Sequence, residues 1–316
     1  MNPEISEIYL ETYDLKKTQD TLEKYGVVVL LNYFSKDQAE TWKSDLIKWL
    51  GDLSPALNVK DTTTWCPKNM PYGPRPGMMQ SLVSHAPTVF EIREAMYPLF
   101  KDLWDTEKLY CSLDGASVHP PIYETKRAKD WPHIDQTRTD VKCIQGQVVL
   151  SESTATFRCT PKSHLKHQEI IELCAKEGDT SNWCKFNQLQ LKVIQPMFDK
   201  WQLPIYSPPG SVILWYSNTI HSAARNQKKD KGWRAVVYVS MRPTEQYTTQ
   251  NKSTLRKAAI SGRTTNHWGS NTFPKRPGFY MQDRRSDAIE VLTDHPEQLV
   301  PEHTPLMQKL LALEEW

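Results

Sequence analysis

The first fifty residues combine one strand-like hydrophobic run with helical patterns. The run GVVVLLNYF (26–34) is continuously apolar over the length of a strand. In the segment that follows, apolar residues recur at helical spacing, namely Ala39, Trp42, Leu46, Trp49 and Leu50. Ser35 precedes this segment and is a residue type that caps helix N-termini. We therefore expect a helix that begins directly after Ser35.

The next two segments differ in their content of helix breakers. Residues 51–80 are rich in Pro, Gly and Thr, and their prolines exclude a long helix. An ordered loop near a site and a plain surface connection both fit this composition. Residues 87–103 again have a helical pattern.

From residue 109 onward the pattern changes to short strands rich in Val, Ile, Leu, Tyr and Thr, separated by turn-forming residues. These are LYCSLDGASVH (109–119), CIQGQVVL (143–150), ATFRCT (155–160), SVILWYS (211–217) and RAVVYVSM (234–241). The piece 165–200 is more helical and reads as an insertion between strands. The last segment, PLMQKLLALEEW (305–316), has the pattern of an amphipathic helix.

Helices followed by a series of short strands predict an α+β chain. Its strands should form a barrel or sandwich, such as a jelly roll, with helices packed outside. We expect a single domain over 1–316. It divides into a helical N-terminal part with a loop (1–108), a strand core (109–242) with the insertion at about 165–200, and a C-terminal extension (243–316).

Composition and charge narrow the class of protein. Of 316 residues, 39% are hydrophobic, and 39 Lys and Arg against 37 Asp and Glu give a net charge of +2. This balance gives no electrostatic argument for nucleic acid or a membrane surface as partner. There is no basic, then apolar N-terminal leader pattern, and none of the six cysteines forms a C-x-x-C pair. We therefore expect a cytoplasmic protein with reduced thiols, whose oligomeric state the sequence leaves open.

The segment WPHIDQ supplies the first candidate metal ligands. His133 and Asp135 are two positions apart, so on a strand both side chains point to the same face. Two suitable ligands would then share one space without any special backbone. The pair alone is weak, because the same spacing occurs often by chance.

A third ligand candidate follows in SPPGSVILWYSNTIHSAA (207–224), where a Pro-Pro-Gly turn leads into an apolar strand and His221 lies beyond its end. Two histidines and one carboxylate form the facial triad of non-haem iron(II) oxygenases. The triad leaves three metal positions open, enough for a bidentate keto acid and dioxygen. The competing interpretation of His221 is a capping or surface histidine.

A basic residue is also needed to bind the distal carboxylate of 2-oxoglutarate. Arg234 begins a strand 13 positions after His221, and a return strand would bring it beside the metal. The arginine fork suits a carboxylate because it can bind both oxygens. Arg225 is a rival, and we favour Arg234; the alternative is that Arg234 starts an edge strand and faces water.

Together these motifs resemble the phytanoyl-CoA dioxygenase superfamily of iron(II)/2-oxoglutarate-dependent oxygenases over roughly 109–242. The resemblance implies a double-stranded β-helix (jelly-roll, cupin-like) core. It also implies Fe(II) as the metal and 2-oxoglutarate as co-substrate. The expected reaction is hydroxylation of a small organic substrate with release of succinate and carbon dioxide, and ascorbate would stimulate turnover. SLDGASVHPP and GRTTNHW are similar to a poorly characterised branch known from fungal and viral sequences. The partner would be a small organic molecule.

Further roles follow only from this resemblance. Gln147 matches a strand residue that lies near the 2-oxoglutarate in relatives. The alternative is that Gln147 is a polar residue on the outer face of the sheet. Ser222 is a weaker candidate beside the distal histidine, and His164 matches a turn histidine with a structural role. Asp114 would either face the cavity or cap the turn to Gly115. The turn glycine that relatives have before His164 is replaced by lysine, in Thr160-Pro161-Lys162-Ser163-His164.

The substrate lies outside these inferences. Candidate walls, for which ordinary packing is the alternative, are Trp65, Tyr72, Arg75 and Met79 in the loop 62–79, and His267 and Trp268 in the tail. A catalytically silent jelly-roll binding protein and a cupin-like metal hydrolase or isomerase stay open as other functions. A nucleic-acid demethylase using the basic tail is disfavoured by the balanced charge.

Overall fold

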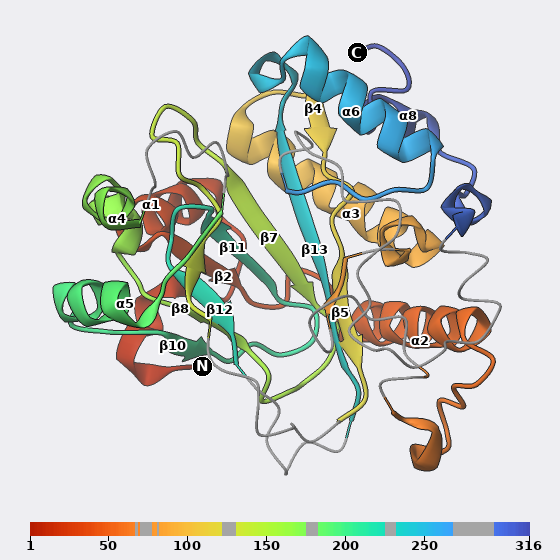
Figure 1. Ribbon diagram of the computed structural model, residues 1–316, viewed down its shortest axis with the longest axis horizontal. Helices are drawn as coiled ribbons and strands as arrows, with labels where there is room; N and C mark the ends of the chain where they lie inside the picture. Colours follow the sequence, from red (N-terminus) through yellow and green to blue (C-terminus); the bar gives the residue numbers. More distant parts are fainter. Residues whose placement is uncertain are drawn as a thin grey trace.

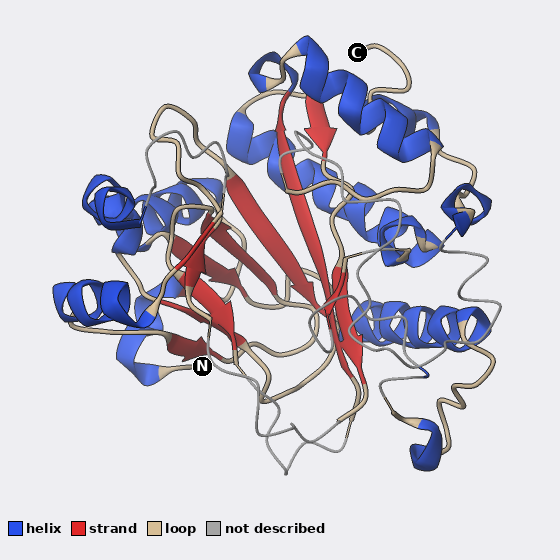
Figure 2. Cartoon of the chain, in the orientation of Figure 1, coloured by secondary structure: helices blue, strands red, loops and turns tan. Residues whose placement is uncertain are grey.

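The computed structural model describes residues 1–66, 69, 78–80, 82–121, 131–174, 183–224, 232–267 and 294–316. Within these residues the chain is a mixed α/β structure in which two β-sheets lie face to face and most helices cover the outside of the larger sheet (Figure 1; Figure 2). The expected combination of helices and a strand core is therefore confirmed at this level.

The helices lie in the N-terminal part, in the insertion and near the C-terminus. They are α1 (Leu15–Tyr25), α2 (Lys36–Leu53), α3 (Pro87–Trp104), α4 (His167–Cys174), α5 (Gln188–Ile194), α6 (Thr249–Ile260) and α8 (Pro305–Leu310). The sequence pattern predicted α2, α3 and α8. It did not predict α6.

The strands form two sheets. The larger has the order β1 (Tyr9–Leu10), β2 (Val27–Leu30), β11 (Val212–Tyr216), β7 (Ile144–Val149), β13 (Arg234–Pro243), β5 (Ala116–His119) and β3 (Met78–Met79), with β4 (Leu109–Cys111) also paired to β13. The smaller has the order β10 (Leu203–Ile205), β8 (Phe157–Cys159), β12 (His221–Ala223), β6 (His133–Ile134) and β9 (Cys184–Lys185).

The start of α2 shows how local sequence sets an element. The hydroxyl of Ser35 accepts a hydrogen bond from the backbone N–H of Gln38 over 3.0 Å, which satisfies one of the free donors of the first turn. The predicted apolar stripe is buried, except for the half-buried Trp49, and packs into the main core. The predicted N-cap is therefore confirmed.

The larger sheet has two different faces because side chains alternate along each strand. Val148, Leu214 and Val237 belong to the main hydrophobic core with the helices. On the opposite face, Gln147 lies in register with Ile213 of β11 and Tyr238 of β13. This second face looks toward the smaller sheet, so its polar residues line the interior between the sheets.

Two turns hold the strand ends that carry the site. Gly210, in the Pro-Pro-Gly turn before β11, has φ +90°, and a Cβ there would lie 2.3 Å from the carbonyl oxygen of Phe34. Lys162 occupies the turn position where the resemblance predicts glycine, and it adopts a left-handed φ of 68°. Its backbone N–H donates to the Tyr25 carbonyl over 2.8 Å. The turn therefore keeps the glycine-like conformation with lysine, at a cost of about 1–2 kcal/mol.

The insertion follows β8 and carries α4, β9 and α5. These elements share a small hydrophobic cluster with the strands of the smaller sheet, made up of Ile134, Ile170, Phe186, Ile194 and Ile220. The insertion is thereby fixed against the strands that carry His133 and His221. No helix in the described part of the chain has the length and apolar character to cross a membrane. The domain limits given above stay a prediction.

Candidate metal centre

The smaller sheet brings the three predicted ligands together. His133 on β6 and His221 on β12 are directly paired across the antiparallel strands. Asp135 follows β6 and is fixed by its backbone N–H, which donates to the Ser217 carbonyl over 2.8 Å. One ligand atom from each of the three side chains lies within 4.8 Å of the others, and all three residues are buried. The i, i+2 spacing therefore does place both side chains of the H-x-D motif in one space.

Backbone hydrogen bonds orient both imidazoles in the same way. Nδ1 of His133 lies 3.0 Å from the Trp131 carbonyl, and Nδ1 of His221 lies 2.8 Å from the Thr219 carbonyl. A carbonyl only accepts, so each Nδ1 carries a proton and each Nε2 is the ring nitrogen left to face Asp135. The Nε2 atoms lie 3.5 Å and 3.2 Å from the carboxylate oxygens of Asp135. Two imidazole Nε2 atoms and one carboxylate therefore converge on one point.

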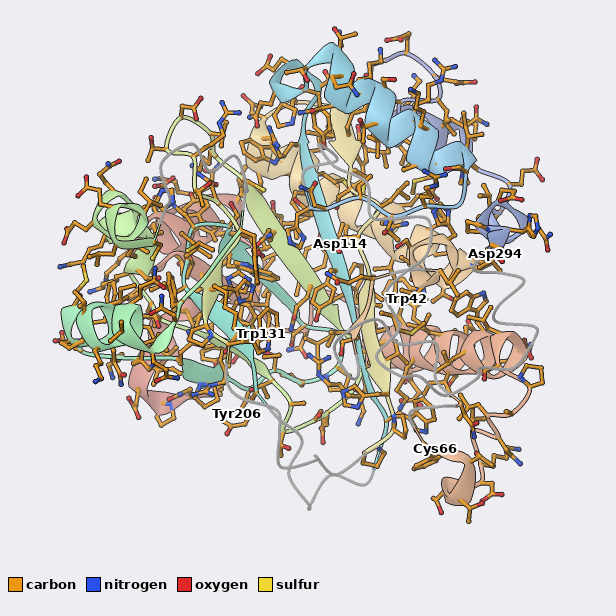
Figure 3. The ribbon with its side chains drawn as sticks, in the orientation of Figure 1. Trp42, Cys66, Asp114, Trp131, Tyr206 and Asp294 are labelled. Carbon is orange, nitrogen blue, oxygen red and sulfur yellow. The ribbon has the colours of Figure 1, made fainter. Side chains whose placement is uncertain are left out.

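Aromatic rings hold the two imidazoles from outside. Trp131, which is labelled in Figure 3, stacks on His133 with ring centroids 4.2 Å apart and 7° between the planes. Phe157 and Trp215 pack against His221 at centroid distances of 5.7 Å and 5.5 Å. These contacts restrict ring rotation and exclude water from one side of the centre. The donor set and its confinement fit iron(II) with open coordination positions.

The Oδ2 atom of Asp135 has two further neighbours. Gln145 on β7 donates from Nε2 over 3.1 Å, and Nε2 of His267 lies 3.2 Å away. Burial favours the neutral acid, but the surrounding histidines, His133 first, hold the pKa of Asp135 well below its ordinary value. Asp135 is therefore ionised, as a metal ligand must be.

His267 lies between two carboxylates. Its Nδ1 forms a hydrogen bond with Oδ2 of Asp114, whose Oδ1 accepts from the backbone N–H of Gly115 over 2.7 Å. Burial works against the charged ring, but Asp114 and Asp135 raise the pKa of His267 well above its usual value. Asp114 thus takes both expected roles, since it caps the turn and faces the interior (Figure 3). His267 was expected only as a substrate wall, and Gln145 was not singled out, although it lies two positions before Gln147 on the same face.

A small pocket, partly open to solvent, lies beside the centre. Phe157, which packs on His221, lines it together with Gln147 and Arg234. Gln147 therefore lies on the inner face of the sheet, and Arg234 is buried rather than on an exposed edge.

The polar groups of this pocket are only partly satisfied. Nε of Arg234 donates to the Ala155 carbonyl over 2.6 Å, while no described residue accepts from its two terminal nitrogens. The hydroxyls of Thr156 and Ser207 are buried and, among described residues, without a hydrogen-bond partner. The indole N–H of Trp215, which packs on the pocket residue Phe157, is also buried without a hydrogen-bond partner among the described residues. Unpaired buried donors are costly unless a ligand satisfies them, so an anionic ligand with several acceptor oxygens fits this end of the pocket.

Other candidates have different surroundings. The hydroxyl of Ser222 donates to Gln202 over 2.5 Å, and as the strand neighbour of His221 it points to the opposite face. We therefore leave Ser222 out of the site. His164 bonds the Glu23 carbonyl over 3.0 Å and lies outside the group of ligands, in keeping with a structural role.

The predicted substrate walls are placed only in part. Met79 is fully buried in the main core, so its assignment as a wall is wrong. Trp65 packs edge-on against Trp233 with ring centroids 5.5 Å apart. The other predicted walls, Tyr72, Arg75 and Trp268, lie outside the described residues. Arg225, the rival of Arg234, also lies outside them.

Comparisons with known proteins were made for the sequence and for the fold. No family sequence model matches the chain. The protein named "Ava biosynthesis cluster protein O" from Aspergillus versicolor is 26% identical over 221 residues, which cover 64% of this chain and 70% of that protein. A Salmonella typhimurium LT2 protein provisionally described as an oxidoreductase has a TM-score of 0.51 at 12% identity, over 93% of this chain and 85% of its own. This likeness concerns the fold.

A second solved structure is that of the epimerase SnoN, in complex with Fe3+, alpha ketoglutarate and nogalamycin RO. It has a TM-score of 0.49 at 12% identity and covers 72% of this chain and 83% of its own.

Proposed function

We propose that the protein is a non-haem iron(II)- and 2-oxoglutarate-dependent dioxygenase of the phytanoyl-CoA dioxygenase type, which hydroxylates a small organic substrate and releases succinate and carbon dioxide. The observation that carries the proposal is the convergence of His133, Asp135 and His221 beside a pocket that contains Arg234. The two facing sheets support a double-stranded β-helix as the underlying fold.

Each residue has a defined task in this proposal. His133 and His221 offer Nε2 atoms, and Asp135 offers an ionised carboxylate, so that one face of the metal is held and the other stays open. The terminal nitrogens of Arg234 bind the distal carboxylate of 2-oxoglutarate as a fork, with Gln147 and the hydroxyls of Thr156 and Ser207 as further partners. Phe157 and Trp215 keep the space between the metal and the pocket dry.

When bound, iron(II) and 2-oxoglutarate together supply the activation of dioxygen that the side chains of a protein cannot perform. The protein's own contribution is orientation, charge and exclusion of water. The substrate is a small molecule, and the relative named for a biosynthesis cluster supports a natural product or its precursor.

The test is turnover and binding measured on one preparation. Metal-free protein is incubated with Fe(II), 2-oxoglutarate and ascorbate in air, with and without candidate small molecules, and succinate is quantified. Asp135→Ala serves as the matched control, because it removes the carboxylate ligand and leaves both histidines. The proposal predicts 2-oxoglutarate-dependent succinate from the wild type and none from Asp135→Ala.

Calorimetry separates the competing functions. A silent binding protein would bind metal and 2-oxoglutarate and yield no succinate with any substrate mixture. A metal hydrolase or isomerase would bind metal and show no heat with 2-oxoglutarate. Either result would contradict the oxygenase proposal.

A further inference from the structure

The C-terminal extension reaches the metal centre through a short docked segment. The backbone N–H of Thr265 donates to the Leu113 carbonyl over 3.0 Å, and the Leu113 N–H donates to the Thr265 hydroxyl over 2.9 Å. Both Thr264 and Thr265 are buried. Two motifs far apart in the sequence, SLDGASVHPP and GRTTNHW, are thus held side by side, and neither contains a residue of the triad.

This docking places His267 between Asp114 and Asp135. Its Nδ1 bonds Oδ2 of Asp114, and its Nε2 lies 3.2 Å from Oδ2 of Asp135. His267 is not in the group of three ligand atoms that lie within 4.8 Å of one another, although it contacts the Oδ2 atom of Asp135 that also faces His221.

Asp114 is itself anchored in the core. Besides the bond from the Gly115 N–H, its carbonyl accepts from Arg93 over 2.8 Å, and Arg93 is fully buried in α3. Arg93 also donates to the Ser84 carbonyl over 2.6 Å. The guanidinium therefore fixes the backbone of Asp114, and the carboxylate of Asp114 in turn fixes the ring of His267.

We propose that His267, held by Asp114, is a positioning residue that keeps the carboxylate of Asp135 in the orientation that faces the two ligating imidazoles. The inference rests on the proposed function, since it assigns His267 a task at the same metal site. It makes the C-terminal extension part of that site, although the extension lies outside the strands that supply the ligands. Partners of this kind typically contribute about 10–100-fold to metal affinity.

The test uses Co(II) as a spectroscopic probe and three substitutions of one residue. His267→Gln places an amide nitrogen close to the position of Nε2, whereas His267→Asn places one close to Nδ1; His267→Ala removes both. Calorimetric Kd values for Co(II) and the visible spectrum of the Co(II) protein are recorded for each variant. Thermal unfolding of the metal-free proteins reports their folding, and His295→Ala, an exposed histidine of the same extension, is the control.

The proposal predicts that His267→Asn and His267→Ala weaken Co(II) binding by at least about tenfold and alter its spectrum. His267→Gln should stay within a few-fold of the wild type with a similar spectrum. Unchanged Kd and spectrum in all three variants, or equal losses in His267→Gln and His267→Asn, would overturn it, whatever happens to the melting temperatures. A wild type that binds no Co(II) would instead refute the metal site of the proposed function.

Discussion

Gln145 donates a hydrogen bond from Nε2 to Oδ2 of Asp135 over 3.1 Å, which joins the central strand of the larger sheet to the metal ligands of the smaller one. The amide is buried, and its strand neighbour on the same face, Gln147, lines the pocket instead. Under the proposed function, one strand thus serves the metal with one glutamine and the co-substrate with the other.

Replacing Gln145 by Leu should therefore weaken metal binding. We expect the Kd for Co(II) to rise by about 10-fold or more, because the carboxylate of Asp135 loses a donor in a buried setting. Gln147→Leu is the matched control, with the same chemical change two positions along. It should leave the Co(II) Kd unaltered and weaken 2-oxoglutarate binding; equal effects of both variants on the metal would contradict this division.

Arg234 should be needed for the keto acid and dispensable for the metal. Arg234→Lys keeps the charge and loses the planar fork, so we expect 2-oxoglutarate affinity to fall by about 2–3 kcal/mol, roughly 30- to 150-fold. Calorimetric titration of 2-oxoglutarate into the Co(II)-loaded protein measures the effect. Arg225→Ala is the comparison. If Arg225→Ala removes binding and Arg234→Lys does not, the assignment of the arginine is wrong.

Two threonines four positions apart, Thr156 and Thr160, should respond differently to loss of the hydroxyl. The hydroxyl of Thr160 accepts from the backbone N–H of Gln202 over 3.1 Å, so Thr160→Val should lower the free energy of unfolding by about 1–2 kcal/mol. The hydroxyl of Thr156 has no partner among the described residues, so Thr156→Val should leave the metal-free protein as stable or slightly more stable.

The same Thr156→Val variant should bind 2-oxoglutarate more weakly. Urea denaturation gives the first quantity and calorimetry the second. A Thr156→Val protein with lower stability and unchanged affinity would place the hydroxyl outside the binding site.

Stability should fall with acidification through His85. Burial lowers the pKa of His85 to about 3, and its Nε2 bonds the Arg263 carbonyl over 2.7 Å. Between pH about 6.5 and 3 the unfolded chain binds a proton that the folded protein does not. The free energy of unfolding should therefore decrease as pH falls through this window, by up to about 1.4 kcal/mol per pH unit from this residue.

His85→Gln keeps an N–H donor and removes the titration, so its stability should depend less steeply on pH. Urea denaturation of the metal-free protein at pH 4 to 8 measures both slopes. Burial also lowers the pKa values of His164, His167 and His303, so the difference between the two proteins, rather than either slope, isolates His85. Parallel curves would contradict the prediction.

The sequence was most informative where local rules decide the outcome. Helical spacing and the Ser35 cap predicted α2, and strand alternation predicted that His133 and Asp135 share one space. The apolar run before His221 became β11 with the expected direction toward the site. These features depend on neighbours within a few positions, which a single sequence displays.

The rest depended on contacts between distant segments. His267 is separated from Asp114 by 153 positions, and no local pattern indicates that the tail returns to the centre. Gln145 has the same residue type and strand face as Gln147, so only their neighbours in the folded chain, Asp135 for one and the pocket for the other, distinguish them. Met79 was taken for a wall because its loop is irregular, whereas the short strand β3 buries it.

The separation of Asp114 from His267 also sets an order for events during synthesis. Chains emerge from the ribosome N-terminus first, and domains fold as their parts become available. The segment 264–267 follows Asp114 and Asp135 in the chain, and it also follows β13, which pairs with β5, so it is the last of these parts to emerge. Under the proposed function, the metal site therefore takes its final form late, when this short tail segment docks.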